Sequence, residues 1–367
     1  MTLIDPKRPV AILGKIHPFF GVGIPLAVAA VVVLVGCKQS QSPAVIKIAA
    51  VGDTNGYSIF EDGIRDDPLK EVHSVLNAQD VFIENFEGVI LSLPPLPETC
   101  PKQARQSAFY SPPHIADFLH PARYAVATLA NNHILDCGIW GIRETVAQLG
   151  RRGILAVGAG ENSKQACEPL RIEVNGVRLA ILAYLAIDGE TLRAGSDGAG
   201  AASWTRCGGN AQIAELAASG SVVLVALHLH QGPGWTEQPF PPDLDLVRRA
   251  LQAGADLVIA HGPHVPQGIL ESNGGVALLS LGDFLMRPDY EVPEKAKRSM
   301  IAEVVISKKT IEVRIVPIRL DHWGHPIVPM PWDASWILSE VAELSEHLGT
   351  KVTVGDGIGR VTVQRRH

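Results

Sequence analysis

Five apolar runs in this chain have the length of buried strands, and each run ends in side chains that carry oxygen or nitrogen donors. The polar residues at the five exits are, in chain order, Asp53; Glu84 and Glu87; Asn131, Asn132 and His133; His228 and His230; and His261 and His264. In an open α/β sheet, the loops beyond the carboxyl ends of the strands share one crevice, where ligands bind. We therefore expect these donors, although far apart in sequence, to meet at one edge of a sheet.

The segments between and after these runs predict the rest of the fold. Helices are expected at 138–150 and at 242–255, the second with apolar residues at helical spacing and Gly254 near its end. Hairpins are expected at 170–184, 268–284 and 302–318. The first of these has an Asn-Gly pair between two strand-like arms, which is a strong hairpin signal. Alternating strands and helices followed by hairpins predict an α/β sheet enlarged by antiparallel strands.

Charge excludes one broad class of partner. The chain has 367 residues, 46% of them hydrophobic, and a formal net charge of −6. Its charges are scattered, and no basic run tracks a phosphate backbone, so we expect no nucleic-acid binding.

The N-terminal residues differ from the rest of the chain. Lys7, Arg8 and Lys15 precede an apolar run at 21–37 that is shorter than the roughly 20 residues of a comfortable spanning helix, which is the layout of a secretory signal. Its last four residues, LVGC, resemble the lipobox of bacterial lipoproteins, in which the cysteine is lipidated. We expect a signal peptide at 1–37, lipidation at Cys37 and a polar tether at 38–44, with an uncleaved anchor helix as the alternative.

Four further cysteines follow the predicted lipidation site: Cys100, Cys137, Cys167 and Cys207. An even number in an exported protein permits two disulfides, for which three pairings are possible. Their spacing does not match a zinc site, so we expect a structural role for all four.

The donors at the strand exits suit a pair of divalent metal ions. Carboxylate and imidazole ligands bind Mn, Fe and Zn, and two such ions can hold a phosphate oxygen and activate water for in-line attack. Each residue alone has an ordinary structural explanation: a Gly-Asp pair is usually a turn, and Asn131 or Asn132 could cap a helix. Five exits of the same kind favour a metal site. No G-x-S-x-G motif supports a serine hydrolase.

Several motifs in the chain resemble the CapA, or poly-γ-glutamate capsule biosynthesis, family, which is related to calcineurin-like metallophosphoesterases. The motifs are GD at 52–53, ENFEG at 84–88, LANNHILDCGIWGI at 129–142, AHGPHV at 260–265 and SLGDF at 280–284. The resemblance covers about 45–320 and implies a four-layer αββα sandwich with a dinuclear metal site. Residues 321–367 are then expected as a C-terminal extension packed on this domain.

The resemblance also implies a role for each site residue. Asp53 and His264 would hold the first metal, with Glu87, or alternatively Glu84, as the bridging carboxylate. The second metal would be held by Asn132, His228 and His261, and His133 would give a proton to the leaving oxygen or stabilise the transition state. Residues expected to orient ligands or bind substrate are Asn55, Asp136, His230 and Asp283, with Glu84 as well if Glu87 bridges.

Three departures from the known patterns leave two functions open. Classical phosphoesterases have Asp-x-His after the first strand, where this chain has Asn55, and their Gly-Asp-x-x-Asp motif is replaced by the Asn-Phe-Glu stretch at 85–87. SLGDF has Asp283 where the CapA family more usually has Asn. One function is a membrane-anchored, extracytoplasmic metal-dependent hydrolase of capsule or poly-γ-glutamate assembly, acting on an anionic polymer or a phosphoester. The other is a non-catalytic protein that binds polymer or capsule-assembly partners and keeps part of the metal site. Lys38 favours an outer membrane over a cell membrane for the anchor.

Overall fold

The computed structural model describes residues 44–56, 66–93, 100, 109–186, 192–229, 232–287 and 291–366. The predicted signal peptide with Cys37, most of the tether, and His230 lie outside the described residues. Within the described ranges, none of the helices combines the length and apolar character needed to span a bilayer.

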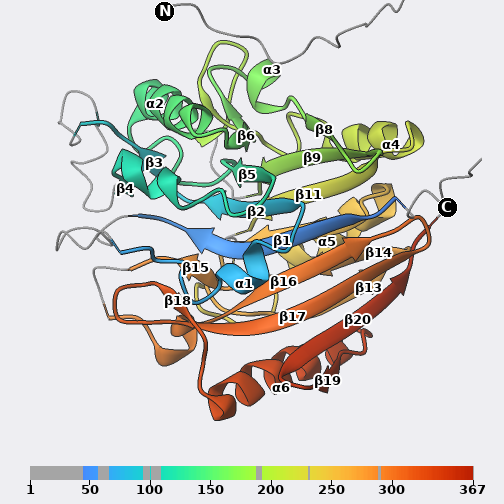
Figure 1. The fold of residues 1–367 in the computed structure, drawn as a ribbon. Coiled ribbons are helices and arrows are strands. Elements are labelled where there is room, and N and C mark those ends of the chain that lie inside the picture. Colours follow the sequence, from blue (N-terminus) through green and yellow to red (C-terminus); the bar gives the residue numbers. More distant parts are fainter. Residues whose placement is uncertain are drawn as a thin grey trace, which may run out of the picture. The chain divides into compact units, whose positions relative to one another are not determined.

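The larger of the two main sheets contains ten strands (Figure 1). Their order is β19-β20-β17-β16-β1-β2-β5-β6, with β15 beside β1 and β18 beside β17. The strands are β1 (Ile46–Thr54), β2 (Val81–Phe86), β5 (Tyr124–Thr128), β6 (Leu155–Val157), β15 (Asp283–Leu285), β16 (Arg298–Ile306), β17 (Thr310–Leu320), β18 (Pro326–Ile327), β19 (Thr353–Gly355) and β20 (Ile358–Gln364). Strands β15, β1, β2, β5 and β6 are parallel, so their carboxyl ends lie on one side. The antiparallel hairpin β16–β17 confirms the one predicted at 302–318.

The second sheet contains six strands in the order β13-β14-β12-β11-β9-β8. The strands are β8 (Leu170–Val174), β9 (Val177–Leu185), β11 (Val222–His228), β12 (Leu257–His261), β13 (Ile269–Ser272) and β14 (Gly275–Leu278). The four inner strands are parallel, and β8 and β13 are antiparallel edges. The hairpin β8–β9 turns at Asn175 and Gly176, both with positive φ, as the Asn-Gly pair predicts.

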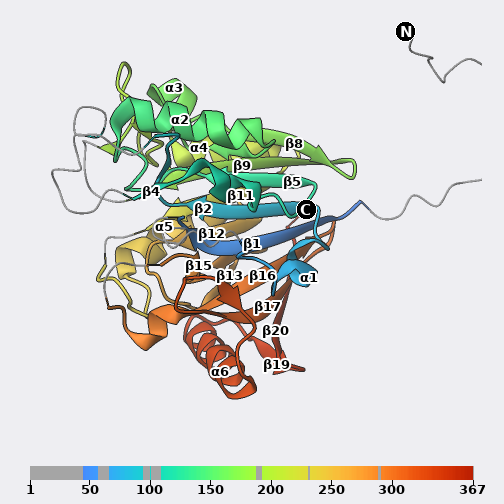
Figure 2. The same cartoon turned by 60° about the vertical axis from the view of Figure 1, so that its left-hand side comes forward.

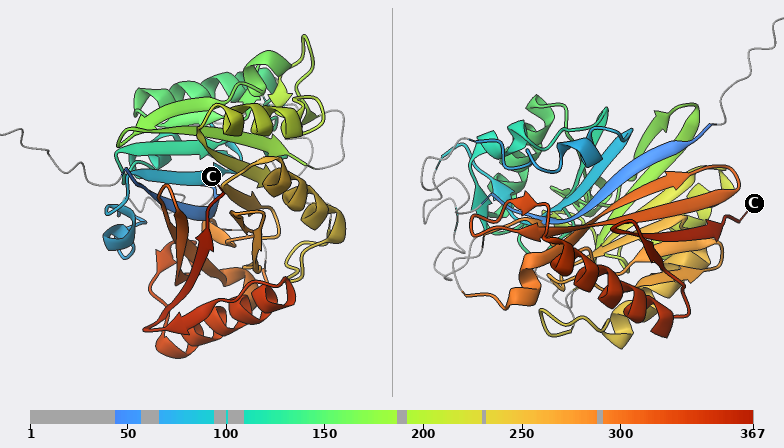
Figure 3. Two further views of the ribbon diagram at one scale, coloured as in Figure 1. Left: turned by 90° about the vertical axis from the view of Figure 1, so that its right-hand side faces the viewer. Right: turned by 60° about the horizontal axis from the view of Figure 1, so that its bottom comes forward.

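Helices complete the expected α/β sandwich. The two sheets contact each other through β1 and β12 and through β14 and β20. Helices α4 (Gly209–Ala218) and α5 (Pro241–Ala253) cover the outer face of the six-stranded sheet, and α1 (His73–Leu76) lies beside the ten-stranded one (Figure 3). Helix α2 (Gly138–Arg151) contacts β6, and α6 (Pro331–His347) contacts β13 and β17 (Figure 2). The predicted fold class is confirmed.

Smaller elements connect these layers. They are β3 (Val89–Ile90) with β4 (Tyr110–Ser111), β7 (Ala159–Gly160) with β10 (Gly200–Ala201), the helix α3 (Ser163–Ala166), and 3-10 turns at Pro113–Asp117 and Glu294–Lys297. Residues after 320 supply β18, α6, β19 and β20, and β20 pairs along β17. Disulfides join Cys100 to Cys137 and Cys167 to Cys207, which selects one of the three possible pairings.

The segment predicted as one hairpin at 268–284 divides between the two sheets. Its first part is the hairpin β13–β14, but the chain then crosses over, and β15 pairs parallel with β1. The crossing depends on glycine: a Cβ at Gly52 would lie 1.8 Å from the carbonyl oxygen of Gly282, which accepts the amide of Asp53 at 3.1 Å. This close approach places Asp283 beside Asp53.

Candidate metal centre

Asp53 lies at the carboxyl end of β1 and contacts residues from both sheets. Its neighbours in register are Asn85 on β2 and Asp283 on β15. From the six-stranded sheet, Nδ1 of His261 lies 3.3 Å from Oδ1 and Nδ1 of His264 lies 3.4 Å from Oδ2. The expected meeting of distant donors at one edge therefore takes place around this buried carboxylate.

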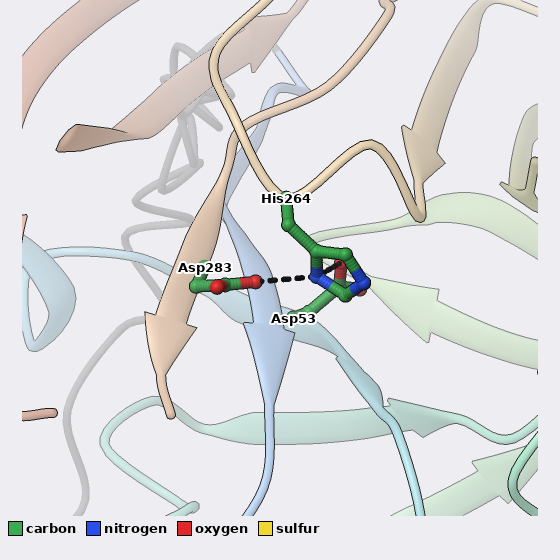
Figure 4. Close-up of side chains that lie close together, drawn as sticks. All are labelled: Asp53, His264 and Asp283. Carbon is green, nitrogen blue, oxygen red and sulfur yellow. Dashed lines mark hydrogen bonds and ion pairs between the residues drawn. The ribbon is translucent and has the colours of Figure 1, made fainter. Parts of the chain in front are cut away.

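One group of potential ligands contains Asp53, His264 and Asp283, which point toward one another (Figure 4). One donor atom from each lies within 4.8 Å of the other two. His264 follows β12 in a turn where its own φ is 57°, and its Nδ1 lies 2.8 Å from Oδ1 of Asp283. Asp283, expected from the resemblance to orient a ligand or bind substrate, thus belongs to a group that could hold a metal ion.

A second group contains Asp53, Glu87 and His228, again with donor atoms within 4.8 Å of one another. Nε2 of His228 lies 3.6 Å from Oε1 of Glu87. Asp53 is the carboxylate common to both groups, whereas the sequence resemblance placed Glu87 in the bridging position. Glu84 belongs to neither group, because successive residues of β2 point to opposite faces and Asn85 faces the site.

Three buried polar atoms at this site have no hydrogen-bond partner among the described residues. They are Oε2 of Glu87, Oδ1 of Asn132 and Nδ1 of His261, whose 3.3 Å contact with Oδ1 of Asp53 does not have hydrogen-bond geometry. A buried polar atom left without a partner costs about 1–3 kcal/mol, so native proteins rarely keep several together. All three atoms carry lone pairs that a cation can accept, and the residues therefore fit a metal ion.

Asn85 and Asn131 are buried positioning residues to which the sequence analysis gave no role as a metal ligand or as a proton donor. The side-chain amide of Asn85 donates to Oδ1 of Asp53 at 2.7 Å and lies 3.1 Å from Nδ1 of His228. Asn131 donates to the carbonyl of Phe86 at 2.7 Å. The available signal was spacing, since Asn85 lies two residues before Glu87 and so faces the same side of the chain.

His133 is held at the edge of the site by two contacts. Its Nδ1 lies 2.8 Å from Oδ2 of Asp136, and its ring stacks on Phe109 with centroids 4.2 Å apart. The Nε2 atom is then directed to the site, 3.9 Å from Oε1 of Glu87. A carboxylate on Nδ1 fixes which nitrogen faces the reacting group, as a general acid requires. The contact with Asp136 therefore holds the imidazole of His133 in this direction.

The side-chain amide of Asn55 donates to the backbone carbonyl of Glu87. Glu84 is fully buried on the other face of β2, and burial raises its pKa to about 8.

The charges of the site compensate one another only in part. Burial raises the pKa of Glu87 well above its usual range, and burial also raises that of Asp283. Burial raises the pKa of Asp53 as well, but the contact with His261 and the positive charge of His264 outweigh it and hold that pKa below its ordinary value. Three carboxylates concentrated in one buried space favour added positive charge.

The site opens into a pocket of about 360 Å³. Its polar wall contains Glu87, Asn132, His133, His264 and Asp283. The rest of the lining is Phe109, Gly234, Trp235, Met286 and Val292. A substrate group in this pocket would contact His133 and both ligand groups at once.

Comparison with known proteins gives one sequence family and several relatives. The family described as bacterial capsule synthesis protein PGA_cap matches residues 47–288. The PGA biosynthesis protein CapA of Bacillus subtilis (strain 168) is 25% identical over 303 residues, covering 80% of this chain and 75% of that protein. The capsule biosynthesis protein CapA of Bacillus anthracis is 31% identical over 166 residues, covering 45% and 40%. A probable polyglutamine synthesis accessory protein of Mycobacterium tuberculosis (strain ATCC 25618 / H37Rv) is 27% identical over 308 residues, covering 78% of each chain.

Among solved structures, similar chains include two nucleotidases. The NAD nucleotidase NadN of Haemophilus influenzae has a TM-score of 0.43 and 10% identity, covering 80% of this chain and 63% of that one. The 5'-nucleotidase precursor of Thermus thermophilus has a TM-score of 0.40 and 13% identity, covering 84% and 60%.

Proposed function

The chain belongs to the bacterial capsule synthesis protein PGA_cap family, and from this membership and the site we propose that it is a metal-dependent hydrolase of capsule or poly-γ-glutamate assembly. We place it outside the cytoplasm, anchored to a membrane by a lipid on Cys37, as its N-terminal sequence predicts. Its substrate class is an anionic polymer or a phosphoester.

One observation carries this proposal: Asp53 is shared by two groups of potential ligands, and three buried atoms beside it lack hydrogen-bond partners among the described residues. We assign His264 and Asp283 with Asp53 to one divalent ion, and Glu87 and His228 with Asp53 to a second. The unpartnered atoms of Asn132 and His261 supply further donors to the same space. Mn, Fe and Zn are the metals that suit such ligands.

Different residues of the chain have different roles in the proposed hydrolysis. Bound divalent ions supply a Lewis acid for the substrate and activated water as nucleophile. Asn85 and the amide of Gly262, which donate to different oxygens of Asp53, fix the orientation of its carboxylate. His133 gives a proton from Nε2 to the leaving atom of the cleaved bond, while Asp136 holds its Nδ1.

A second candidate function is a binding or assembly protein that retains a partial metal site. The observation that favours it is Asn55, which stands where classical phosphoesterases have a histidine and whose side-chain amide donates to the backbone carbonyl of Glu87. The placement of Asp283 beside His264 favours the hydrolase, because it supplies a donor that compensates for the absent histidine.

Metal content and turnover together distinguish the two functions. The purified full chain is analysed for bound metal and assayed with a generic phosphodiester and with poly-γ-glutamate. A hydrolase is expected to bind metal and to lose turnover when His133 is replaced by Asn. Less than one metal per chain, with no turnover that depends on His133, would instead support the binding function.

A further inference from the structure

Positively charged side chains gather at the end of the molecule opposite the metal centre. We call this surface the basic end, and it consists of Lys47, Arg178, Lys308, Lys309 and Arg366. Lys47 is at the start of β1, Arg178 is at the start of β9, and the two other lysines form the turn between β16 and β17. Arg366 follows β20, and the start of β1 and the C-terminal end of the chain lie on the same side in Figures 1 and 3.

Strand pairing brings these residues together. Ile46 pairs with Ile306, so the turn that carries Lys308 and Lys309 lies beside the start of β1. Thr310 pairs with Gln364, which places Arg366 next to the same turn. A pocket of about 310 Å³ lined by Ala44, Arg178 and Lys308, among others, joins the ends of the two sheets.

The side chains of the basic end are exposed and form no ion pairs within the described part of the chain. All five are exposed, and none forms an ion pair with a described residue. Among the described residues, Arg178 and Arg366 donate to backbone carbonyls, those of Ser219, Leu251 and Asn273. This differs from the neighbouring Arg365, which is paired with Asp256.

Three carboxylates on the adjoining strands, those of Asp80, Glu173 and Glu312, reduce the positive charge of the basic end but do not cancel it, because five cations face three anions. Glu173 faces Arg178 across the hairpin β8–β9, and Glu312 is on β17. Asp80 accepts the backbone amide of Lys47 and the side chain of Asn175. A concentration of positive charge therefore stands on a chain whose formal net charge is −6.

The length of the tether decides what this surface faces. Ala44, the first described residue, is seven residues beyond Cys37. Seven fully extended residues span at most about 25 Å. A lipid on Cys37 would thus keep the start of β1, and the basic end beside it, close to the bilayer surface.

We propose that the basic end binds anionic phospholipid headgroups of the membrane that carries the anchor. The inference rests on the lipid anchor of the proposed function. Lysine and arginine side chains near a surface are attracted to anionic lipids within a Debye length of about 8–10 Å. Strand β1 then extends about 26 Å away from the bilayer along its axis. This orientation turns the metal pocket away from the membrane.

Hydrogen exchange on a membrane tests the proposal. The full chain is reconstituted on nanodiscs of phosphatidylcholine, with or without phosphatidylglycerol, and exchange at residues 306–310 is followed by mass spectrometry. We expect slower exchange on the anionic discs only, and loss of this protection at high salt and in the variant Lys308→Glu with Lys309→Glu. The control, Lys164→Glu with Lys351→Glu, makes the same change in net charge at exposed sites elsewhere and should keep the protection.

The outcomes separate this inference from the anchor itself. If the chain is retained on both kinds of disc and residues 306–310 exchange equally on both, the proposal that the basic end binds anionic lipid is wrong. The lipid anchor would still account for the retention. Retention on anionic discs alone, lost in the Lys308 and Lys309 variant, would support the basic end without the anchor. If the chain binds neither kind of disc, the lipid anchor and the lipid-binding role of the basic end are both wrong.

Discussion

Asp53 is the residue on which the site depends, because both of its carboxylate oxygens have assigned neighbours. Oδ1 contacts Asn85 and His261, and Oδ2 accepts the amide of Gly262 and lies near His264. A carboxylate that cannot rotate presents its remaining lone pairs in fixed directions. This is the property that a bridging ligand needs.

Replacing Asn85 with Ala tests this positioning role. The loss of its hydrogen bond frees the Asp53 carboxylate, and metal affinity should fall by about 10–100-fold, the usual effect of removing a partner that orients a ligand. Affinity is measured by competition with a chromogenic chelator. Asn77→Ala, an exposed position after α1, should leave the affinity unchanged; an equal affinity in both variants would argue against the role.

His133 is expected to affect turnover and not metal binding. Replacing it with Asn removes a proton donor that contributes about 10²–10⁴-fold to rate, while the ligand groups stay intact. The prediction is a matching loss of kcat with unchanged metal content, and a smaller loss for Asp136→Asn, which only releases the imidazole. A His133 variant that keeps full kcat on a phosphodiester would contradict the assignment.

The raised pKa of Glu84 predicts how the free energy of unfolding depends on pH. Burial raises its pKa to about 8, from an ordinary 4.5, so the folded chain holds a proton there that the unfolded chain releases. Between these values the free energy of unfolding should fall as pH rises, by up to about 1.4 kcal/mol per pH unit.

The variant Glu84→Gln, which cannot ionise, should lose this contribution. Urea denaturation at pH 5, 6, 7 and 8 measures the slope. The control variant Glu173→Gln lies on the exposed edge strand β8 and should keep the slope of the unmodified chain. A Glu84→Gln variant with an unchanged slope would show that this carboxyl does not hold the proton.

At the scale of elements, the contact between β15 and β1 brings Asp283 to the site. Gly52→Ala would place a Cβ 1.8 Å from the carbonyl oxygen of Gly282, and backbone would have to move to relieve the clash. We expect a loss of about 3 kcal/mol in the free energy of unfolding, at the upper end of overpacking costs, together with weaker metal binding. Thermal denaturation and metal titration measure the two effects.

Gly150→Ala is the matched control for this substitution. Gly150 lies near the end of α2, and no described atom lies within 4 Å of the position that its Cβ would take, so alanine should stabilise the chain by about 0.5–1 kcal/mol. If the two alanine variants had the same stability and metal affinity, the close approach of β15 to β1 would not hold in solution.

The elements that the sequence predicted are those with local signals. The Asn-Gly turn of β8–β9 and the helical spacing of α5 need no information from distant residues. The crossing of β15 to the other sheet could not be predicted, because it depends on the fit of Gly282 against Gly52, which are far apart in sequence. The pairing of the cysteines depends on tertiary contacts in the same way.

For the site, the sequence predicted which residues lie at the strand ends, but not which of their atoms contact one another. Strand exits identified Asp53, Glu87, His228, His261 and His264 as residues that should meet, and the structure brings them together. The sharing of Asp53 between two ligand groups depends on distances of a few ångströms that no sequence spacing encodes. The inward placement of Asp283 follows from a long-range strand pairing.

At the scale of the whole molecule, the two ends of the sheets carry different chemistry. Carboxylates, amides and imidazoles lie at the carboxyl ends of the parallel strands. The first residues of these strands lie at the other end, beside the basic turn at Lys308 and Lys309. The metal pocket and the predicted tether are thus separated by the length of β1. In the proposed function, this arrangement would let the anchored domain present its pocket to a polymer outside the membrane.

Anomalous X-ray diffraction from crystals of this chain grown with Zn²⁺ tests whether Asp53 binds two metal ions. We expect two peaks that both lie about 2.0–2.2 Å from the carboxylate of Asp53, one beside His264 and Asp283 and the other beside Glu87 and His228. Crystals that contain zinc but show no anomalous peak within coordination distance of Asp53 would contradict this expectation.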